Sequence, residues 1–283
     1  MSSSREARER GPLRFWCEPE LDRPSLIIGW SVDAGRLGMR VIDYLNRKLD
    51  GRIFCEIEPA DFFPLGGVSI EDDLVQFPES KFYACDVDNL VLFKSAPPSY
   101  AWHEFLNLIL DAAERWQVKE IYSIGGIVSP GAHTAPRELV GVFNSPELKA
   151  SLGRYSLNAD LDYETPSGQR PTLSAFLLWA ARRRNINAVN LWVPVPFYLV
   201  AMDDPRAQKR VLEFFNERFD LRLDFIDLDA EISQQNETLA EVRSRVPDVD
   251  EYIKKLESNL VLSTEENQKL AAEIENFFRE KKT

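Results

Sequence analysis

Short, continuous runs of apolar residues alternate along the chain with longer segments in which apolar residues recur at helical spacing. Runs of the first kind are typical of strands buried on both faces, and stripes of the second kind are typical of helices that cover a sheet. Strands are expected at residues 26–30, 52–58, 90–94, 120–124, 139–143 and 188–193. The alternation predicts an α/β fold with three layers, α/β/α, in which the middle layer is a mostly parallel, mixed sheet.

Between these strands the spacing predicts amphipathic helices, each of which must bury its apolar stripe. The expected stripes are Leu37, Val41, Tyr44 and Leu45; Trp102, Phe105, Leu106, Ile109, Ala113 and Trp116; Leu173, Phe176, Leu177, Ala180 and Ala181; and Val211, Leu212, Phe215 and Phe219. Residues 68–84 break the alternation, and their short polar and apolar stretches predict an antiparallel excursion from the main sheet.

From residue 229 onward the pattern changes to three helices without strands, with Pro247 ending the first. Asp248 with Glu251, and Ser263 with Glu266, have capping-box spacing for the next two. The apolar stripe of this extension either packs back on the α/β body or forms a contact between subunits. The candidate interaction residues are Ile253, Leu256, Leu260, Leu270, Ile274 and Phe277.

The expected organisation is therefore a disordered N-terminus at residues 1–14, an α/β/α domain at 15–228 and a C-terminal helical extension at 229–283. A chain of 283 residues with 44% hydrophobic content is long enough to bury a large core.

Charge and composition exclude several classes of protein. The 34 basic and 46 acidic residues give a net charge of −12, which would repel a nucleic-acid backbone. The longest apolar run, residues 191–202, is broken by Pro194 and Pro196, so neither a membrane span nor a secretion signal is expected. Cys17, Cys55 and Cys85 are far apart, which favours a soluble cytoplasmic protein without disulfides or a zinc cluster.

Chemistry is expected where strands end, because ligands of open α/β sheets bind in the crevice at the carboxyl ends of the strands. Loops at residues 30–38, 95–99, 125–136 and 194–199 qualify, and the richest in polar residues and glycine is 125–136. The residues proposed to line a ligand pocket there are Asp33, Gly35, Arg36, Gly125, Gly126, His133, Thr134 and Arg137.

These residues do not form a recognisable catalytic set, so no catalytic residue and no cofactor are assigned. GxGxxG, the phosphate-binding P-loop and GxSxG are all missing from the sequence. Asp33 either serves such a pocket or caps the helix that follows, and Gly35 either admits an anion or is a packing glycine. His133 acts either as a proton donor or anion ligand, or as a hydrogen-bonding anchor of its loop. His103 lies on a helix face and is interpreted as a surface or packing histidine.

An acidic stretch contains Asp160, Asp162 and Glu164. Alternation along a strand would aim all three carboxylates to one side, where they could bind a hard cation or simply be solvated. Solvation is the commoner outcome, and no metal site is assigned.

Four blocks, in this order, resemble the proteasome assembly chaperone family in its bacterial and archaeal, second-chaperone form. They are GWSVDAG, SIGGIVSPGAHTAPRELVGVFN, VNLWVPVPFYL and LDAEISQQNETLAEVRSRVPDVDEYIKKLE, and the similarity covers roughly residues 25–260. The sharpest element is the pair His133-Thr134 followed by Pro136.

The resemblance implies a phosphorylase-like body, self-assembly into trimers or small rings, and a role in holding proteasome subunits without chemistry. Members of the family that bind proteasomes dock through a C-terminal hydrophobic-tyrosine-any tail. Residues 277–283 read FFREKKT and do not match that tail, so direct docking into a proteasome pocket is not expected.

Two functions follow as hypotheses. The first is a non-enzymatic, homo-oligomeric assembly chaperone or scaffold whose partner is a proteasome-like or other protein. The alternative is a small-ligand-binding protein, or a phosphorylase-like or hydrolase-like enzyme, that uses the crevice at the strand ends.

Overall fold

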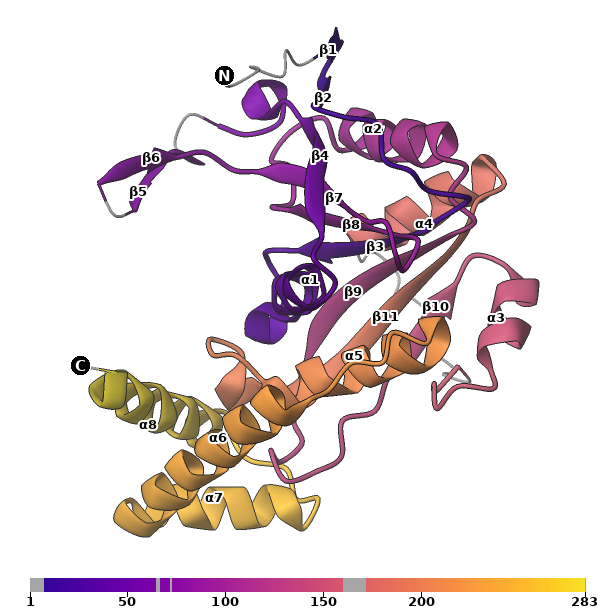
Figure 1. Cartoon of the computed structure of the whole chain (residues 1–283). Coiled ribbons are helices and arrows are strands. Elements are labelled where there is room, and N and C mark those ends of the chain that lie inside the picture. Colours follow the sequence, from indigo (N-terminus) through magenta and orange to yellow (C-terminus); the bar gives the residue numbers. More distant parts are fainter. Residues whose placement is uncertain (1–7, 65–66, 72, 160–171, 283) are drawn as a thin grey trace. The chain divides into compact units, whose positions relative to one another are not determined.

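The structure, a computed structural model of the chain, describes residues 8–64, 67–71, 73–159 and 172–282 (Figure 1). The strands are β1 Arg8–Arg10, β2 Leu13–Phe15, β3 Ser25–Trp30, β4 Arg52–Ile57, β5 Ser69–Glu71, β6 Leu74–Gln76, β7 Ser80–Cys85, β8 Leu90–Ser95, β9 Glu120–Ser129, β10 Val140–Phe143 and β11 Asn187–Pro196. The α-helices are α1 Leu37–Lys48, α2 Trp102–Arg115, α3 Pro146–Leu152, α4 Leu173–Arg183, α5 Pro205–Phe219, α6 Ile226–Arg245, α7 Pro247–Glu257 and α8 Thr264–Lys282. Short 3-10 helices are η1 Ala34–Arg36, η2 Pro59–Asp61 and η4 Phe197–Leu199.

The main sheet has nine strands in the order β1-β2-β4-β7-β8-β3-β9-β11-β10. Strand β3 pairs in parallel with β8 on one side and with β9 on the other. Strands β1, β2, β4, β7 and β8 form a run of antiparallel pairs at the other end of the order. The sheet is therefore mixed, and the α/β class predicted from the sequence is confirmed.

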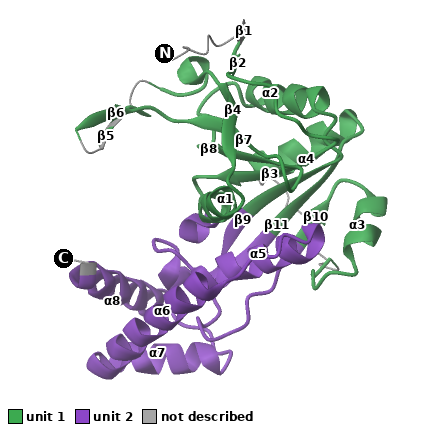
Figure 2. Ribbon diagram, in the orientation of Figure 1, with its two compact units in different colours: residues 1–32, 38–124, 141–191 green, residues 33–37, 125–140, 192–283 purple. Residues whose placement is uncertain are grey.

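The chain divides into two compact units, and β9 and β11 each contribute residues to both (Figure 2). Unit 1 consists of residues 1–32, 38–124 and 141–191, and unit 2 of residues 33–37, 125–140 and 192–283. Both units are discontinuous in sequence, so neither coincides with the predicted domain boundary at residue 228.

Helices cover both faces of the sheet within unit 1. Leu26, Ile28 and Trp30 of β3 belong to the same buried cluster as the apolar stripes of α2 and α4. Alternate residues of a strand point to opposite faces, so Gly29 faces the other side. There it lies against α1, because a Cβ at Gly29 would be only 2.3 Å from the carbonyl oxygen of Gly38. This side-by-side arrangement accounts for the three layers.

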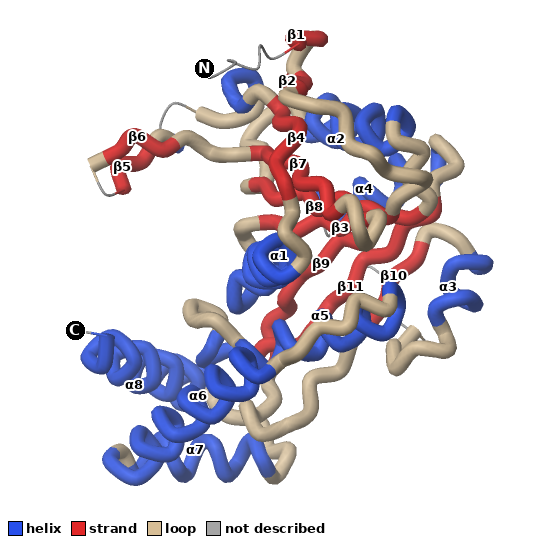
Figure 3. The backbone as a smooth tube through the Cα atoms, viewed as in Figure 1, coloured by secondary structure: helices blue, strands red, loops and turns tan. Residues whose placement is uncertain are grey.

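All six strands expected from the sequence are present, and three features differ from expectation. β1 and β2 form an antiparallel hairpin on β4, where residues up to 14 were expected to be disordered; residues 1–7 lie outside the described residues. The excursion at residues 68–84 contains the separate β5–β6 hairpin, but its last part, β7, joins the main sheet. β9 continues beyond residue 124 to Ser129 (Figure 3).

The C-terminal extension forms three helices, α6, α7 and α8, as the sequence predicted. Ser263 and Glu266 form the expected reciprocal capping box at the start of α8. The capping role predicted for Asp248 is wrong, because α7 begins one residue earlier at Pro247 and its cap position, Val246, makes no side-chain cap. Proline is favoured at the first position of a helix since it has no N–H to satisfy.

None of the described helices is long and apolar enough to cross a membrane.

The close approach of α1 to β3 gives a first test. Gly29→Ala is expected to lower the free energy of unfolding by roughly 2–3 kcal/mol, because its Cβ would overlap the backbone of Gly38 and overpacking strains a close-packed core. Urea denaturation measures this change. Gly153→Ala is the control, since the nearest heavy atom to its Cβ lies at an ordinary 3.5 Å, and its effect should stay within about 0.5 kcal/mol. Equal effects of the two variants would contradict the packing described.

Candidate functional site

All eight residues predicted to line the pocket belong to unit 2. They lie on two loops, one after β3 and one that includes the end of β9 and the residues after it. A third segment, residues 197–204 after β11, contacts both loops, as the hydrogen bonds below show. We call it the bridging segment.

The loop after β3 is held by its backbone as well as by its side chains. Gly35 has a positive φ of 71°, which glycine adopts at no steric cost, and its N–H donates to the carbonyl oxygen of Val200 at 3.0 Å. Arg36 forms an ion pair with Asp203 at 2.8 Å, and its side chain is 57% exposed. Both contacts attach the loop to the bridging segment.

Asp33 does not cap the helix that follows it. Its carboxylate instead accepts a hydrogen bond from the backbone N–H of Gly126, at 2.9 Å. A side chain at Gly126 would collide with the loop, because its Cβ would be 2.0 Å from the carbonyl oxygen of Ala34. The backbones of the two loops are thus in close contact at Ala34 and Gly126.

His133 is buried, at 6% exposure, and is bound to one tyrosine through two atoms. The hydroxyl of Tyr198 lies 2.6 Å from the backbone nitrogen of His133 and 2.8 Å from its ring Nδ1. The backbone N–H donates to the hydroxyl, and the hydroxyl and Nδ1 share a second hydrogen bond, whose direction is set by the tautomer of the ring.

The surroundings of His133 favour the neutral form of its ring. Burial lowers the pKa of His133 to about 4, and the positive charges of Arg243 and Arg137 act in the same direction, against Glu257. Burial likewise raises the pKa of Tyr198. A general acid or base works best with a pKa near the operating pH, and this histidine lies well below neutrality. Its geometry is that of an anchor for the loop.

Arg137 makes a buried ion pair with Asp204. Its side chain is 5% exposed and that of Asp204 1%, and Nε donates to Oδ2 at 2.9 Å. The other carboxylate oxygen of Asp204 accepts the N–H of Ala207 and so caps α5. Arg137 Nη1 also donates to the carbonyl oxygen of Ala135 at 2.9 Å. One carboxylate therefore fixes the loop and a helix end together.

Thr134 connects its loop to the C-terminal helices. Its hydroxyl donates to Glu257 at 3.3 Å, and Glu257 also accepts a hydrogen bond from Arg243 at 2.8 Å. Arg243 in turn donates to Asp250 at 2.8 Å. The hydrogen bond to Arg243 is the main cause that lowers the pKa of Glu257, and the bond to Thr134 acts in the same direction.

Gly125 lies beside the ring of Trp192, whose Cδ1 would be 3.4 Å from an added Cβ. The eight predicted residues thus lie on two loops of unit 2, and the polar side chains among them are engaged in contacts within the chain. The ligand-binding role given to them stays a prediction.

A groove lies next to the His133 loop on the side of α5 and α6. It has a volume of about 520 Å³. Its lining is largely basic and comprises Ala135, Pro136, Arg137, Arg206, Lys209, Arg210, Glu213, Asp229 and Ile232. Of these cations, Arg137 is paired with Asp204, Lys209 with Asp229, and Arg206 donates to the neutral amide of Asn236.

With one exception, the sequence pattern does not indicate which residues form hydrogen bonds or ion pairs with the predicted site residues. Tyr198, Asp203 and Glu257 carry no local signal for their contacts. Asp204 does, because an aspartate before a proline at the start of an apolar helical stripe is typical of an N-cap.

Of the candidate interaction residues on the C-terminal helices, Ile253, Leu256, Leu270 and Ile274 are buried within the chain itself. Leu260 is 57% exposed, and Phe277 is partly buried with Arg245 and Lys281 over its ring. Most of this stripe therefore packs inside unit 2, where α6, α7 and α8 contact one another and α8 contacts η4.

Asp160, Asp162 and Glu164 lie outside the described residues. Among the residues that are described, no three His, Cys, Asp or Glu side chains are grouped so that they could hold a metal ion.

The fold and the site define a mixed α/β protein whose strand-end loops are bound to its own backbone and side chains. A family model described as the PAC2 family matches residues 26–243, so the chain belongs to that family. The family resemblance carried by the four sequence blocks is confirmed. No curated protein matches the chain in sequence.

Several solved structures share the fold. A protein of unknown function from Corynebacterium glutamicum has a TM-score of 0.75 at 19% identity, covering 87% of this chain and 96% of that one. A Pyrococcus furiosus protein, PbaB, described as an archaeal proteasome activator, has a TM-score of 0.68 at 21% identity, covering 82% and 98%. A proteasome-assembly chaperone homologue from Mycobacterium tuberculosis has a TM-score of 0.68 at 18% identity, covering 81% and 99%.

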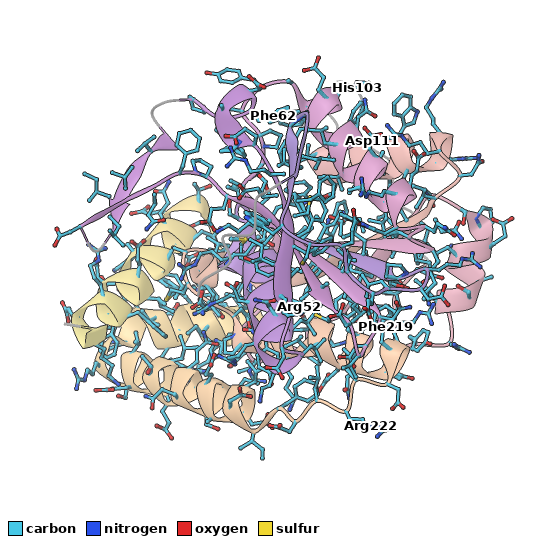
Figure 4. The ribbon with its side chains drawn as sticks, turned by 45° about the horizontal axis from the view of Figure 1, so that its top comes forward. Arg52, Phe62, His103, Asp111, Phe219 and Arg222 are labelled. Carbon is cyan, nitrogen blue, oxygen red and sulfur yellow. The ribbon has the colours of Figure 1, made fainter. Side chains whose placement is uncertain are left out.

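The buried ion pair gives a prediction of stability. Arg137→Ala is expected to lower the free energy of unfolding by about 3–5 kcal/mol, because it leaves the carboxylate of Asp204 buried without its counter-ion. Arg222→Ala is the control, since Arg222 and Asp220 are 3.8 Å apart and both 85% exposed, and it should change stability little. Figure 4 labels Arg222, which projects away from the chain around it. Chemical denaturation of both variants measures the difference.

His133 gives a prediction of pH dependence. Between pH 6.5 and about 4 the unfolded chain binds a proton at His133 that the folded chain does not, so stability falls as the pH is lowered through this window. The loss attributable to His133 should reach about 3 kcal/mol at the acid end. In His133→Gln this part of the pH dependence should disappear, as measured by chemical denaturation at a series of pH values.

His103→Gln is the matched control, because His103 is the other histidine of the chain and is exposed. It should keep the wild-type pH dependence. A His133→Gln variant with the wild-type slope between pH 6.5 and 4 would show that the ring is protonated in the folded state.

Proposed function

We propose that this protein is a non-enzymatic, homo-oligomeric assembly chaperone or scaffold that acts by binding other proteins. Membership of the PAC2 family supports a chaperone-like role. Its fold is shared with an archaeal proteasome activator and with a mycobacterial proteasome-assembly chaperone homologue. The first partners to test are therefore subunits of a proteasome.

The observation that carries the proposal is the use made of the polar side chains in the two strand-end loops. Asp33 accepts a hydrogen bond from the backbone of Gly126, and the buried ring of His133 is hydrogen-bonded to Tyr198. Arg137 is paired with Asp204 inside the protein. These contacts hold the two loops in place, as a rigid surface for binding another protein requires.

A cytoplasmic location belongs to the same proposal. Cys17, Cys55 and Cys85 are all free, which fits a reducing compartment. Burial raises the pKa of Cys85 to about 12 and that of Cys55 further, so neither buried thiol is a reactive thiolate at neutral pH.

The alternative function is binding of a small anion, and the basic groove beside α5 favours it. Arg206, Lys209 and Arg210 lie close together on α5 and line this groove. In a chain with a net charge of −12 such a concentration of cations would attract phosphate or carboxylate groups.

The proposal predicts self-association and capture of a protein partner. Light scattering after gel filtration should give a mass that is a multiple of 32.5 kDa. Immobilised protein should retain proteasome α-subunits from the same organism, and the retained amount should be unchanged in His133→Gln. A monomer that retains no subunit would refute the proposal.

A thermal-shift screen of inorganic phosphate, nucleotides and sugar phosphates separates the two functions. A ligand at a hundred times its dissociation constant would stabilise the fold by about 2.7 kcal/mol. No stabilisation is expected if the protein is a chaperone alone. A shift that Arg206→Ala abolishes and Arg222→Ala preserves would establish the alternative instead.

A further inference from the structure

The β5–β6 hairpin is a two-stranded sheet separate from the main one. It belongs to unit 1 and extends from the chain that leads into β7 (Figures 1 and 3). Its base is anchored, because Phe77 packs against the core cluster of unit 1 and an added Cβ at Gly67 would be 3.1 Å from the ring of Pro78. The hairpin is therefore an arm with a fixed base.

The outer part of this arm is apolar and exposed. Ile70 is 74% exposed, Leu74 64% and Val75 72%. Ile70 and Val75 are directly paired across the two strands, so their side chains share one face of the hairpin. Such a cluster in water has the character of a surface that is covered by a partner.

The backbone of the hairpin also favours contact with a partner. A single two-stranded hairpin is marginally stable in water, and a sheet of three or more strands is needed for independent stability. Among the described residues, each strand of the hairpin also has one edge without a strand partner, and natural sheets block such edges with charges. Strand β5 ends in Glu71, next to Asp72 and Asp73, whereas β6 has the uncharged sequence Leu-Val-Gln. The edge of β6 is thus left open for pairing.

We propose that β6 pairs with β6 of a second copy of this chain, in an antiparallel arrangement centred on Val75. The two hairpins then form one four-stranded sheet, which reaches the size at which a small sheet becomes stable. Leu74 of each copy lies opposite Gln76 of the other, and Val75 lies opposite its own equivalent.

The charges near the hairpin favour a second copy of this chain as the partner and an antiparallel arrangement of the two β6 strands. The sequence around the link between β5 and β6 is acidic, with Glu71, Asp72 and Asp73, so a parallel approach of two copies would bring like charges together, whereas the antiparallel approach keeps them apart. An anionic lipid surface or an acidic protein segment would be repelled by the same residues. The same edge of a second copy is uncharged and has the matching apolar residue at its centre.

This assignment rests on the proposed function, since it identifies the surface through which the proposed oligomer forms. Val75→Glu should lower the mass measured by light scattering, because it places two like charges opposite each other at the centre of the contact. Val87→Glu is the matched control: Val87 is 97% exposed in the turn between β7 and β8, and the wild-type mass should persist.

Cysteine cross-linking tests the geometry directly. Opposed residues of antiparallel strands have Cα atoms about 4.5–5.5 Å apart, which lies within the range of a disulfide. In a Cys17→Ser background, mild oxidation of Val75→Cys should give a covalent dimer, while Val87→Cys should remain monomeric on a denaturing gel. Cys55 and Cys85 are buried and should not contribute.

The outcomes separate this inference from the function on which it rests. A wild-type oligomer that persists in Val75→Glu, or equal cross-linking of the two cysteine variants, overturns the hairpin contact and leaves the proposed function standing. A monomeric wild-type chain overturns both the contact and the self-association. Loss of proteasome-subunit capture in Val75→Glu at unchanged mass assigns the hairpin to that partner and overturns its assignment to a second copy.

Discussion

The candidate site depends on the position of the bridging segment, residues 197–204. The hydroxyl of Tyr198 fixes His133, and the carboxylate of Asp204 fixes Arg137. On the other side the carbonyl of Val200 and the carboxylate of Asp203 hold the loop after β3. Two loops that are about a hundred residues apart in sequence are thus attached to one short stretch of chain.

The elements of the fold were largely predictable because burial leaves a strong pattern. A strand such as Ser25–Trp30, buried on both faces, is apolar from Leu26 onward, and a helix that covers such a strand must be apolar on one side. The pattern failed where burial is weak. β1 and β2 are three residues long and mostly polar, so nothing in their composition distinguishes them from a disordered terminus.

The sequence predicted which loops to consider but not the contacts that their side chains make. Strand-end loops meet at one edge of a parallel sheet, and the loops of Asp33 and His133 both contact the bridging segment. The sequence did not reveal that Gly126 is a strand residue, because glycine is typical of turns and its reason here is the backbone of Ala34. The hydrogen bonds that engage His133 and Arg137 reach 65 and 67 residues along the chain, beyond any local pattern.

The contact between α8 and η4 links the C-terminal helices to the candidate site. The first residues of the bridging segment are those of η4, so α8 packs against the segment that holds both loops. Tyr198 lies in η4 and is hydrogen-bonded to the buried ring of His133, so the packing of α8 supports the residue that holds this loop.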